Sequence, residues 1–514
     1  MSKYSFYSLS ALSLATLAVA ILPGSARAFG FNDVVAKAKA LAAKPYVAPK
    51  AAPSFLANLD YNEFRKIRFD PKQSLWHQSH STFQVMLVAP GLYFKHIVNI
   101  HVVDAAGVHQ VPFKKDWFSW PKKLEAKIPD DLGYAGFKLT YPLNDGPNVQ
   151  NQFLVFAGVS YFRGVARGEN FGLSARGIAV DTGLASGEEF PIFTDYWLVR
   201  PSPKSHVLRF FALLNGPSLT GAYEFLVTPG APTQVKVKAS LFVRKDITLL
   251  GFAPLTSMFY YGQNTPRPAG QWRAAVHDSD GLLIHSSSGE WLWRPLINPI
   301  NLSMDYFEAD SPKGFGLLQR DRHFRDYQDA GARYDTRPSA WITPHNDWGN
   351  GHVVLVEIPT DTEINDNIVA FWSPDKAPKA GDHYDLSYTL DFGGGGITGE
   401  PLARAVNSFV GNGGKTNVYR FVVDFKGGPL AKLKPNASVQ ADVSGLNGAK
   451  ILQQTVDWVQ PLGVWRVSFL AQEPAGKPLD LRAFLKSGDQ TLSETWSYEL
   501  PSPNRIPTHA TPGS

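Results

Sequence analysis

The chain has 514 residues and no cysteine, and its 50 Lys and Arg against 45 Asp and Glu give a formal net charge of +5. The lack of cysteine excludes disulfides, thiolate metal sites and cysteine nucleophiles. So small a charge excess favours neither nucleic acid nor an anionic membrane surface as a partner. Aromatic residues make up 13% of the chain, and such rings fill β-sandwich cores or offer flat surfaces to sugars.

Residues 1–28 have the layout of a secretory signal peptide. Lys3 is the only charge before the apolar run LSALSLATLAVAIL, and Ala26 and Ala28 occupy the small-residue positions of a cleavage site. A retained membrane helix would need roughly 20 apolar residues without such an exit. We therefore expect Sec-type export to the periplasm, cleavage after Ala28, and a mature chain that does not span a membrane. No twin arginine precedes the apolar run, which argues against a cofactor loaded in the cytoplasm, so none is expected.

The mature chain begins with one helical pattern and then alternates like a β protein. Residues 31–46, FNDVVAKAKALAAKPY, predict a helix that Asn32 or Asp33 could cap. Alternating segments such as TFQVMLVAPGLYF, VKVKASLFVR and VYRFVVDF then recur between Gly and Pro turns. These patterns predict antiparallel β-sheets and few helices.

A domain boundary is indicated near residues 393–416, where GGGGITGEP is followed by LARAVNSFVGNGGK. Two glycine-rich pieces around a short segment are typical of a flexible connection. The predicted organisation is a large β domain over 29–395, a linker over 396–416, a sandwich of about seven short strands over 417–504, and a tail over 505–514. The linker could instead fold back over a cleft, since long loops in compact proteins are often functional.

Long motifs, taken together, resemble the periplasmic glucan biosynthesis proteins G and D. The motifs are YFRGVARGENFGLSARGIAVDTGLASGEEFP, LGFAPLTSMFYYG, VHDSDGLLIHSSSGEWLWRPL, GFGLLQRDRHFRDYQD, RPSAWITP, LVEIPTDTEINDNIVAFW and QTLSETWSYELP. The resemblance covers about residues 29–502. The Sec-type signal is more similar to the G member, because the D member usually carries a twin-arginine signal.

The resemblance implies both a fold and an activity. The fold is all-β, with a large N-terminal β-sandwich similar to the galactose-mutarotase sandwiches and a C-terminal immunoglobulin-like sandwich. The implied activity is that of an inverting endo-β-1,2-glucanase that serves the biosynthesis of osmoregulated periplasmic glucans. The implied partners are β-1,2-glucan and the membrane glucan synthase machinery.

Inverting hydrolysis requires one carboxylic acid that protonates the leaving oxygen and one carboxylate that activates water. The family's catalytic pair matches Asp366 in EINDNIVAFW, as general acid, and Asp278 in VHDSDGL, as general base. Without the resemblance, each is an Asp in a turn beside a strand, and most such side chains merely bond their own backbone.

Further candidates for sugar binding fall into two groups. The acidic candidates Glu290 and Glu357 could hold sugar hydroxyls, or could be buried partners of nearby arginines. Each aromatic candidate could be a stacking surface or part of a core. The substrate-binding candidates are Tyr261, His277, Glu290, Trp291, Trp293, Arg320, Tyr327, Trp348, Glu357 and Arg404.

Two further questions concern metal and function class. His277, His285 and His323 are the histidines weighed as zinc ligands, but a zinc site requires three ligands with supporting carboxylates, so no metal is expected. A non-catalytic scaffold that presents the glucan backbone to synthesis or branching machinery remains the alternative to the enzyme. Both need an aromatic cleft, and only the enzyme needs both aspartates.

Overall fold

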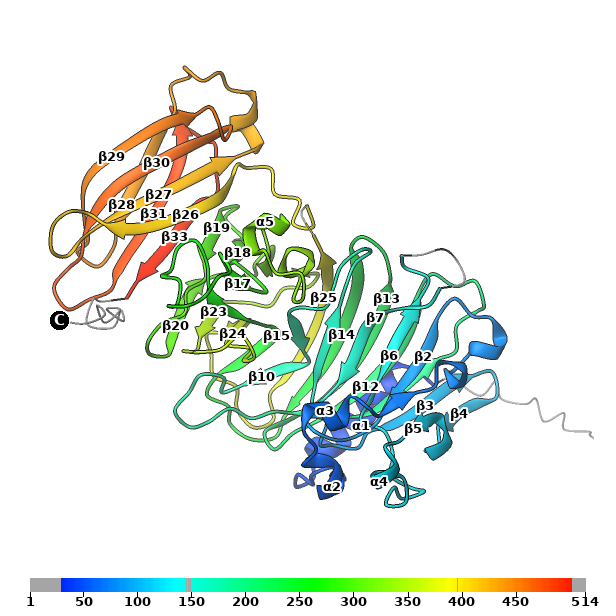
Figure 1. Ribbon diagram of the computed structural model, residues 1–514. Helices are drawn as coiled ribbons and strands as arrows, with labels where there is room; N and C mark the ends of the chain where they lie inside the picture. Colours follow the sequence, from blue (N-terminus) through cyan, green and yellow to red (C-terminus); the bar gives the residue numbers. More distant parts are fainter. Residues whose placement is uncertain (1–28, 145, 147–148, 395, 502–514) are drawn as a thin grey trace, which may run out of the picture.

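A computed structural model describes residues 29–144, 146, 149–394 and 396–501 (Figure 1). The expected signal peptide with its cleavage site after Ala28, and the expected tail over 505–514, lie outside these residues. Among the described residues, no helix has the length and apolarity needed to cross a membrane.

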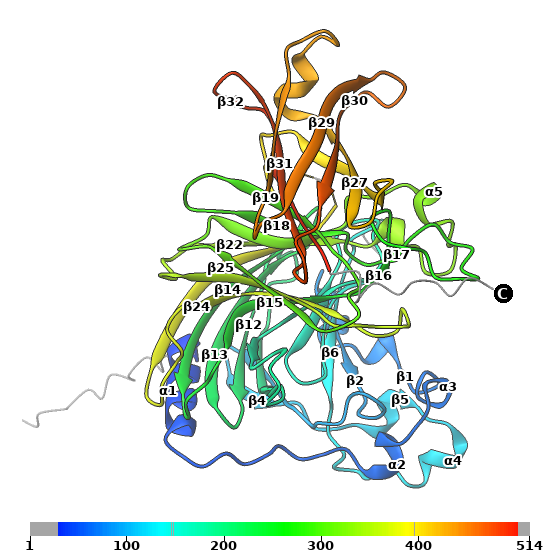
Figure 2. The same ribbon diagram turned by 90° about the vertical axis from the view of Figure 1, so that its left-hand side faces the viewer.

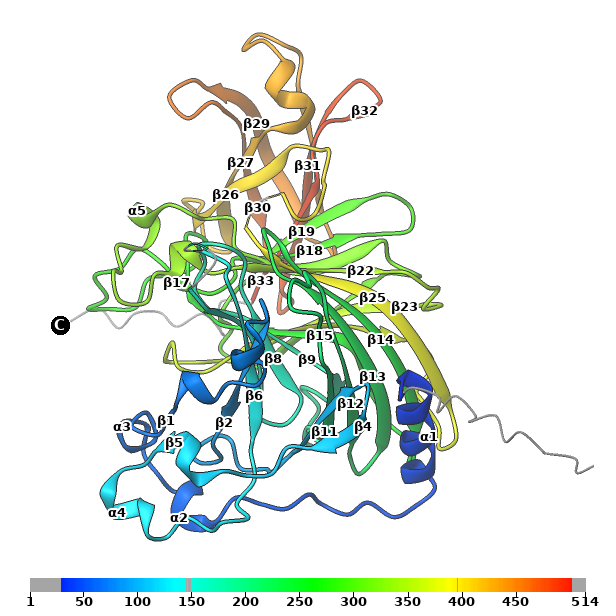
Figure 3. The same cartoon turned by 90° about the vertical axis from the view of Figure 1, so that its right-hand side faces the viewer.

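The predicted helix near the start of the mature chain is present as α1 (Phe31–Ala42), but its cap differs from the prediction. Gly30 is the N-cap residue, and its backbone N–H donates to Asp33 Oδ2 at 2.7 Å. Asp33 therefore satisfies the helix start from inside the first turn, where a carboxylate also suits the helix dipole. Val34 and Ala38 are buried, and α1 lies against the outer side of the large sandwich beside Leu219–Thr228, as Figures 2 and 3 show.

The other helices are single turns, and the remainder of the described chain is mostly strand, which confirms the all-β fold class. The short helices are α2 (Ser54–Ala57), α3 (Tyr61–Phe64), α4 (Lys122–Glu125) and α5 (Phe324–Tyr327), with 3-10 turns η1 (Pro71–Gln73), η2 (His77–Ser79), η3 (Lys115–Trp117), η4 (Tyr334–Thr336) and η5 (Gly428–Lys432). Two small strand pairs stand apart from the main sheets: β1 (Arg68–Phe69) with β5 (Phe118–Ser119), and β16 (Phe259–Tyr261) with β17 (Val276–His277).

The large sandwich has two sheets. Sheet I has the order β2 (Gln84–Val88), β6 (Gly136–Tyr141), β7 (Asn151–Ala157), β8 (Tyr161–Gly164), β9 (Ser174–Arg176), β15 (Leu250–Ser257), β24 (Ile368–Pro374), β23 (Gly351–Glu357), β20 (Ser303–Glu308), with β10 (Ile178–Val180) beside β15. Sheet II has the order β28 (Gln440–Gly445), β31 (Leu479–Ser487), β33 (Thr495–Leu500), β19 (Trp291–Pro295), β18 (Gly281–His285), β21 (Gly314–Leu318), β22 (Ser339–Pro344), β25 (His383–Gly393), β14 (Thr233–Val243), β13 (Leu219–Thr228), β12 (Leu208–Asn215), β11 (Ile192–Val199), β3 (Asn99–Asp104), β4 (Gly107–Gln110), with β32 (Gln490–Thr491) beside β31.

Aromatic side chains fill the space between sheets I and II. Phe156 of sheet I lies edge-on to Phe210 and Phe225 of sheet II, with ring centroids 5.1 Å apart in both pairs. Strand alternation places every second residue on this inner face, and all three rings are fully buried. Much of the high aromatic content therefore serves the core.

The second sandwich packs sheet III against the β28, β31 and β33 end of sheet II. Sheet III has the order β26 (Arg404–Asn412), β27 (Val418–Lys426), β30 (Val464–Gln472), β29 (Lys450–Val459). Its core stacks Phe421 on Phe469 with centroids 5.2 Å apart, beside Trp496. Parallel pairing of β19 with β33 joins the two sandwiches into one continuous sheet II, which Figure 1 shows rising into the upper sandwich.

The expected linker over 396–416 holds a strand. β26 lies inside that range and pairs with β27 from Arg404 to Asn412, so the second sandwich begins before residue 417. The connection between β25 and β26 is therefore residues 394–403. The sequence pattern did not predict this strand, because the segment is short and lies between glycines. Its hydrogen bonds come from β27, which lies across the following turn.

Limited proteolysis is expected to cut this connection in preference to β26. Glycine-rich loop backbone without a strand partner opens at little cost, whereas residues 404–412 are held in a ladder. Mass spectrometry of early fragments should place the first cuts within 394–403 or the turn at 413–417. First cuts between Ala405 and Gly411 would contradict the assignment of β26 to the second sandwich.

Candidate active site

Asp366 stands at the end of the connection between β23 and β24. Its neighbour Asn367 is buried and fixes that connection, because its side-chain amide donates to Phe259 O at 3.0 Å and to Ile358 O at 2.9 Å. The Phe259 backbone N–H donates back to Asn367 Oδ1 at 2.9 Å. The Asp366 side chain is 34% exposed, and Arg163 Nη2 donates to its Oδ2 at 3.0 Å. A rigid backbone thus presents a partly exposed carboxyl group.

Asp278 directly follows β17 and is only 4% exposed, so it does not belong to the surface turn that its sequence suggests. Its backbone N–H donates to Met258 O at 2.8 Å. Arg337 Nη1 donates to Asp278 Oδ1 at 2.6 Å, and the Arg337 guanidinium lies 4.5 Å from the centre of the Tyr334 ring. The Asp278 carboxyl group is therefore held in place by the Arg337 guanidinium, which itself packs on Tyr334.

The two carboxyl groups influence each other and share their cations. Burial raises the pKa of Asp278 to about 6, against the opposing charge of Arg337, and the negative charge of Asp366 raises it further. Burial also raises the pKa of Asp366, while Arg163 and Arg337 lower it. A pair of interacting carboxyl groups with perturbed pKa values marks a candidate site for acid–base catalysis.

Several polar residues around this pair were not among the sequence-predicted candidates. Arg163 connects Asp366 to Ser174 Oγ, which lies 2.7 Å from its Nε. Arg273 pairs with Asp329 at 3.0 Å and with Glu363 at 2.6 Å, and Glu363 belongs to the same connection as Asp366. The arginines 163 and 337 both lie within the motifs that carry the family resemblance, and this signal could have identified them.

One exposed ring also belongs to this region. Trp272 is 66% exposed beside Arg273, whose guanidinium lies 6.0 Å from its ring centre. An exposed large ring beside a carboxylate site is the kind of surface on which a sugar stacks. Trp272 was not a sequence candidate because no pattern distinguishes it from the many core rings.

Three predicted substrate-binding residues form a buried layer next to Asp278. His277 Nδ1 lies 2.9 Å from Gln319 Oε1, and burial lowers the pKa of His277 to about 4, so its ring is neutral. Tyr261 donates to Arg273 O at 3.3 Å, and Tyr327 donates to Asp321 O at 3.0 Å. All three side chains are buried, so none of them offers a ring face on which a sugar could stack. Their contacts instead support the backbone beside Asp278.

Four other predicted residues lie at the junction of the two sandwiches. Arg320 lies 3.5 Å from the centre of the Trp293 ring and donates to Glu494 Oε2 at 2.9 Å. Glu290 accepts from Thr495 at 2.7 Å and pairs with Arg482. The sequence left each of these residues open between sugar binding and a structural role. In the structure their contacts join the two sandwiches, and Trp291 is buried there.

The remaining three predicted residues are also engaged in internal contacts. Trp348 belongs to the core of the large sandwich, 5.6 Å from Trp372. Glu357 is fully buried, accepts from the Ile297 backbone N–H at 2.8 Å and pairs with Arg294 at 3.3 Å. Arg404 pairs with Glu400 at 3.0 Å, in the connection before β26.

The histidines weighed as zinc ligands do not come together within the described chain. His285 stacks on Trp291 with centroids 3.9 Å apart, whereas His277 is bonded to Gln319. Among the residues the structure describes, no three His, Asp or Glu side chains gather in a way that could hold a metal ion.

Comparison with known proteins identifies the family. The model of the family described as periplasmic glucan biosynthesis protein, MdoG, matches residues 29–500. The chain belongs to this family. Glucans biosynthesis protein G of Ralstonia nicotianae is 44% identical over 489 residues, which cover 93% of this chain and 97% of that protein. Glucans biosynthesis protein G of Sodalis glossinidius is 42% identical over 492 residues, which cover 92% of this chain and 94% of that protein.

Membership in the family supports the predicted resemblance to the G and D proteins and connects the chain with the biosynthesis of periplasmic glucans. The family description also implies a periplasmic protein.

Proposed function

We propose that this protein hydrolyses the β-1,2-linked backbone of osmoregulated periplasmic glucans with inversion, as an endo-glucanase. The observation that carries the proposal is the electrostatically linked pair of Asp278 and Asp366, set among arginines. Inverting hydrolysis needs two carboxyl groups, one of which must hold a proton near neutral pH. Burial raises both pKa values, which is the direction that this condition needs.

The exposure of the two groups supports the roles that the resemblance gives them. Asp366, at 34% exposed, is the group that a glycosidic oxygen can reach, as a general acid must. Asp278 is enclosed and bonded to Arg337, so as general base it would receive the proton through a bridging water or a sugar hydroxyl. The directions of the pKa shifts are the same for both groups, so the division of roles rests on exposure and on the resemblance.

Polar side chains on the outer face of sheet I support a neutral sugar chain as substrate. In register across the sheet, Lys138 of β6 lies opposite Val155 of β7, and Val155 lies opposite Arg163 of β8, which binds Asp366. At the far end a cavity of about 420 Å³ is lined by residues that include His80, Gln84, Thr140, Gln150 and Gln152. Amide and hydroxyl groups suit sugar hydroxyls, which both donate and accept.

The test is incubation of the mature protein with linear β-1,2-glucan. Products should shorten internally and appear first in the α configuration, because inversion at a β bond demands it. First products in the β configuration would replace inversion by a covalent intermediate. A protein that binds the glucan and never shortens it would favour the scaffold function, in which the glucan is presented to the membrane synthase machinery.

The export signal is part of the same proposal. Residues 1–28 would direct the chain to the periplasm, and protein recovered from that compartment should begin at Phe29 on N-terminal sequencing. A sequence that starts at Met1 would exclude cleavage after Ala28.

Replacing Arg163 with Met is expected to move the alkaline limb of the pH–rate profile to higher pH. Arg163 lowers the pKa of Asp366 against burial, so its loss raises that pKa further and keeps the acid protonated to higher pH. The measurement is kcat against pH on linear β-1,2-glucan. Arg325→Met, at a 78% exposed side chain, is the matched control, and identical profiles for the two variants would remove Arg163 from the control of the acid.

A further inference from the structure

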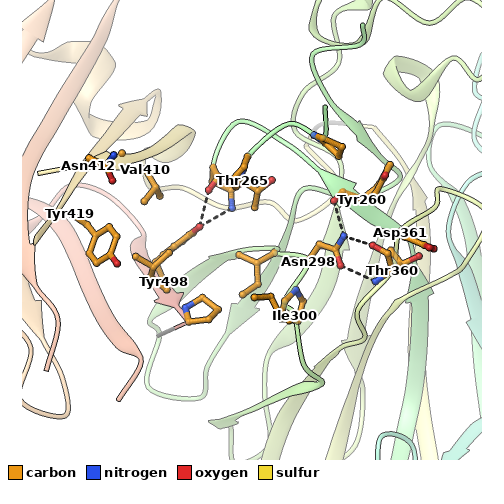
Figure 4. Close-up of a pocket in the computed structure, with 18 residues that line it drawn as sticks. Tyr260, Thr265, Asn298, Ile300, Thr360, Asp361, Val410, Asn412, Tyr419 and Tyr498 are labelled. Atoms are coloured by element: carbon orange, nitrogen blue, oxygen red, sulfur yellow. Dashed lines mark hydrogen bonds between the residues drawn. The ribbon is translucent and has the colours of Figure 1, made fainter. Parts of the chain in front are cut away.

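Another cavity lies between the two sandwiches, and neither Asp278 nor Asp366 lines it (Figure 4). Its volume is about 520 Å³, within the range of roughly 300–1,000 Å³ that small-molecule sites occupy. Tyr260, Asn298 and Asp361 come from the large sandwich, and Asn412, Tyr419 and Tyr498 come from β26, β27 and β33. A ligand here would touch both sandwiches, and junctions of this kind are preferred places for ligand sites.

The lining indicates the chemistry of the ligand. None of the described residues around the cavity is Lys, Arg or His, so nothing there would attract a phosphate or another anion. Asp361 is the single acidic residue of this lining. Most of the remaining surface is apolar, with three tyrosine rings and several prolines. Rings of this kind pack against the C–H faces of sugars.

Some polar groups of the cavity are already committed and make its walls rigid. The Asn298 amide donates to Tyr260 O at 3.1 Å and to Thr360 O at 2.8 Å, while Asn298 Oδ1 accepts from the Thr360 backbone N–H at 3.0 Å. The Tyr498 hydroxyl donates to Asn264 O at 3.1 Å, as the dashed lines in Figure 4 show. Preorganised walls reduce the conformational entropy that the protein must lose when a ligand binds.

Other polar groups of the cavity have no such commitment. Within the described chain, the structure gives no hydrogen bond to the Tyr260 hydroxyl, the Asn412 amide or the Asp361 carboxylate. Burial raises the pKa of the Tyr419 hydroxyl, and the negative charge of Glu473 raises it further. A hydroxyl or an amide can both donate and accept, and a carboxylate accepts. This set matches the hydroxyl groups of a neutral sugar, each of which also donates and accepts.

We propose that this cavity is a second saccharide site, which binds a neutral gluco-oligosaccharide stretch of the glucan chain away from the bond that is cut. The identity of the sugar rests on the proposed function. Asp361 of the cavity and Asp366 of the pair lie in the same connection between β23 and β24, and Asn298 fixes the start of that connection. One glucan chain held here would therefore be tethered close to the loop that carries the acid.

The test measures binding of linear β-1,2-glucan by calorimetry in the Asp366→Asn background, where hydrolysis does not interfere. Tyr419→Ala and Asn412→Ala should each weaken binding about fivefold, the factor that roughly 1 kcal/mol of sugar contact represents. Phe409→Ala is the matched control, because Phe409 is exposed on the same strand β26 and does not line the cavity. Binding by both cavity variants as tight as that of the control would overturn the second site.

The outcomes separate this inference from the proposed function. If the unmodified protein never shortens the glucan while Tyr419→Ala and Asn412→Ala still weaken binding, the glucanase proposal fails and the second site stands. If the unmodified protein shortens the glucan and both variants bind normally, the second site fails alone. Asn412 is exposed, so its variant remains a valid test even if loss of the half-buried Tyr419 disturbs folding.

Discussion

Asp366→Asn is expected to lower the rate of glucan hydrolysis by a factor of roughly 10² to 10⁴, the usual contribution of a general acid. Asparagine keeps the size of the side chain and can still accept from Arg163, but it has no acid proton to give. Because the loop is held by Asn367 and not by Asp366, the fold and the affinity for glucan should persist. The measurements are kcat on linear β-1,2-glucan and calorimetric binding of the same polymer.

Two comparisons make this result specific. Asp130→Asn changes an exposed carboxylate away from the site and should leave the rate unchanged. Asp278→Asn should lower the rate similarly by removing the base, and should also lower the melting temperature, since it removes the buried charge that Arg337 pairs with. Activity retained by Asp366→Asn would remove that residue from catalysis.

The sequence predicted the fold class because alternation and turns are local properties. It did not predict the strand β26, because a strand between glycines depends on a partner that the local pattern does not show. The same limit applies to the aromatic motif around Trp291 and Trp293. Its rings suggest a sugar surface, but β19 pairs with β33 from the far end of the chain, and this pairing buries them at the junction.

The candidate site shows a similar division between local and distant information. The resemblance supplied Asp278 and Asp366, whereas their burial, their shared arginines and their mutual influence depend on the meeting of two connections far apart in the sequence. Glu357 illustrates the opposite case. The sequence left it open between sugar binding and a buried ion pair, and the structure shows the ion pair, with Arg294.

Arg294 is the centre of an acidic cluster where the two sandwiches meet. Its Nη2 lies 2.9 Å from Asp305 and 3.3 Å from Glu357, and its side chain is only 2% exposed. Glu499 belongs to the same electrostatic group. Burial raises the pKa of Glu357 to about 8 and that of Glu499 to about 7, with Asp305 adding to both shifts. One guanidinium therefore faces several carboxyl groups, and two of them, Glu357 and Glu499, have raised pKa values.

These shifts fix the sign of a pH effect on stability. A carboxyl group whose pKa is raised in the folded state binds its proton more tightly there than in the unfolded chain. Its contribution to the free energy of unfolding is complete below its ordinary pKa of 4.5 and is lost as pH rises toward about 8. As pH rises through this window, more negative charge accumulates around Arg294, and the need for its cation grows.

Arg294→Met is therefore expected to cost about 3–5 kcal/mol of unfolding free energy at pH 8, where the carboxyl groups lose their buried partner. At pH 5 the cost should be clearly smaller, because Glu357 and Glu499 are then protonated and need less compensation. Urea unfolding followed by tryptophan fluorescence at both pH values measures the difference. Arg209→Met, which breaks a surface pair with Glu224, should cost little at either pH. An equal cost for Arg294→Met at pH 5 and pH 8 would mean that packing of the arginine stem, and not its charge, holds the junction together.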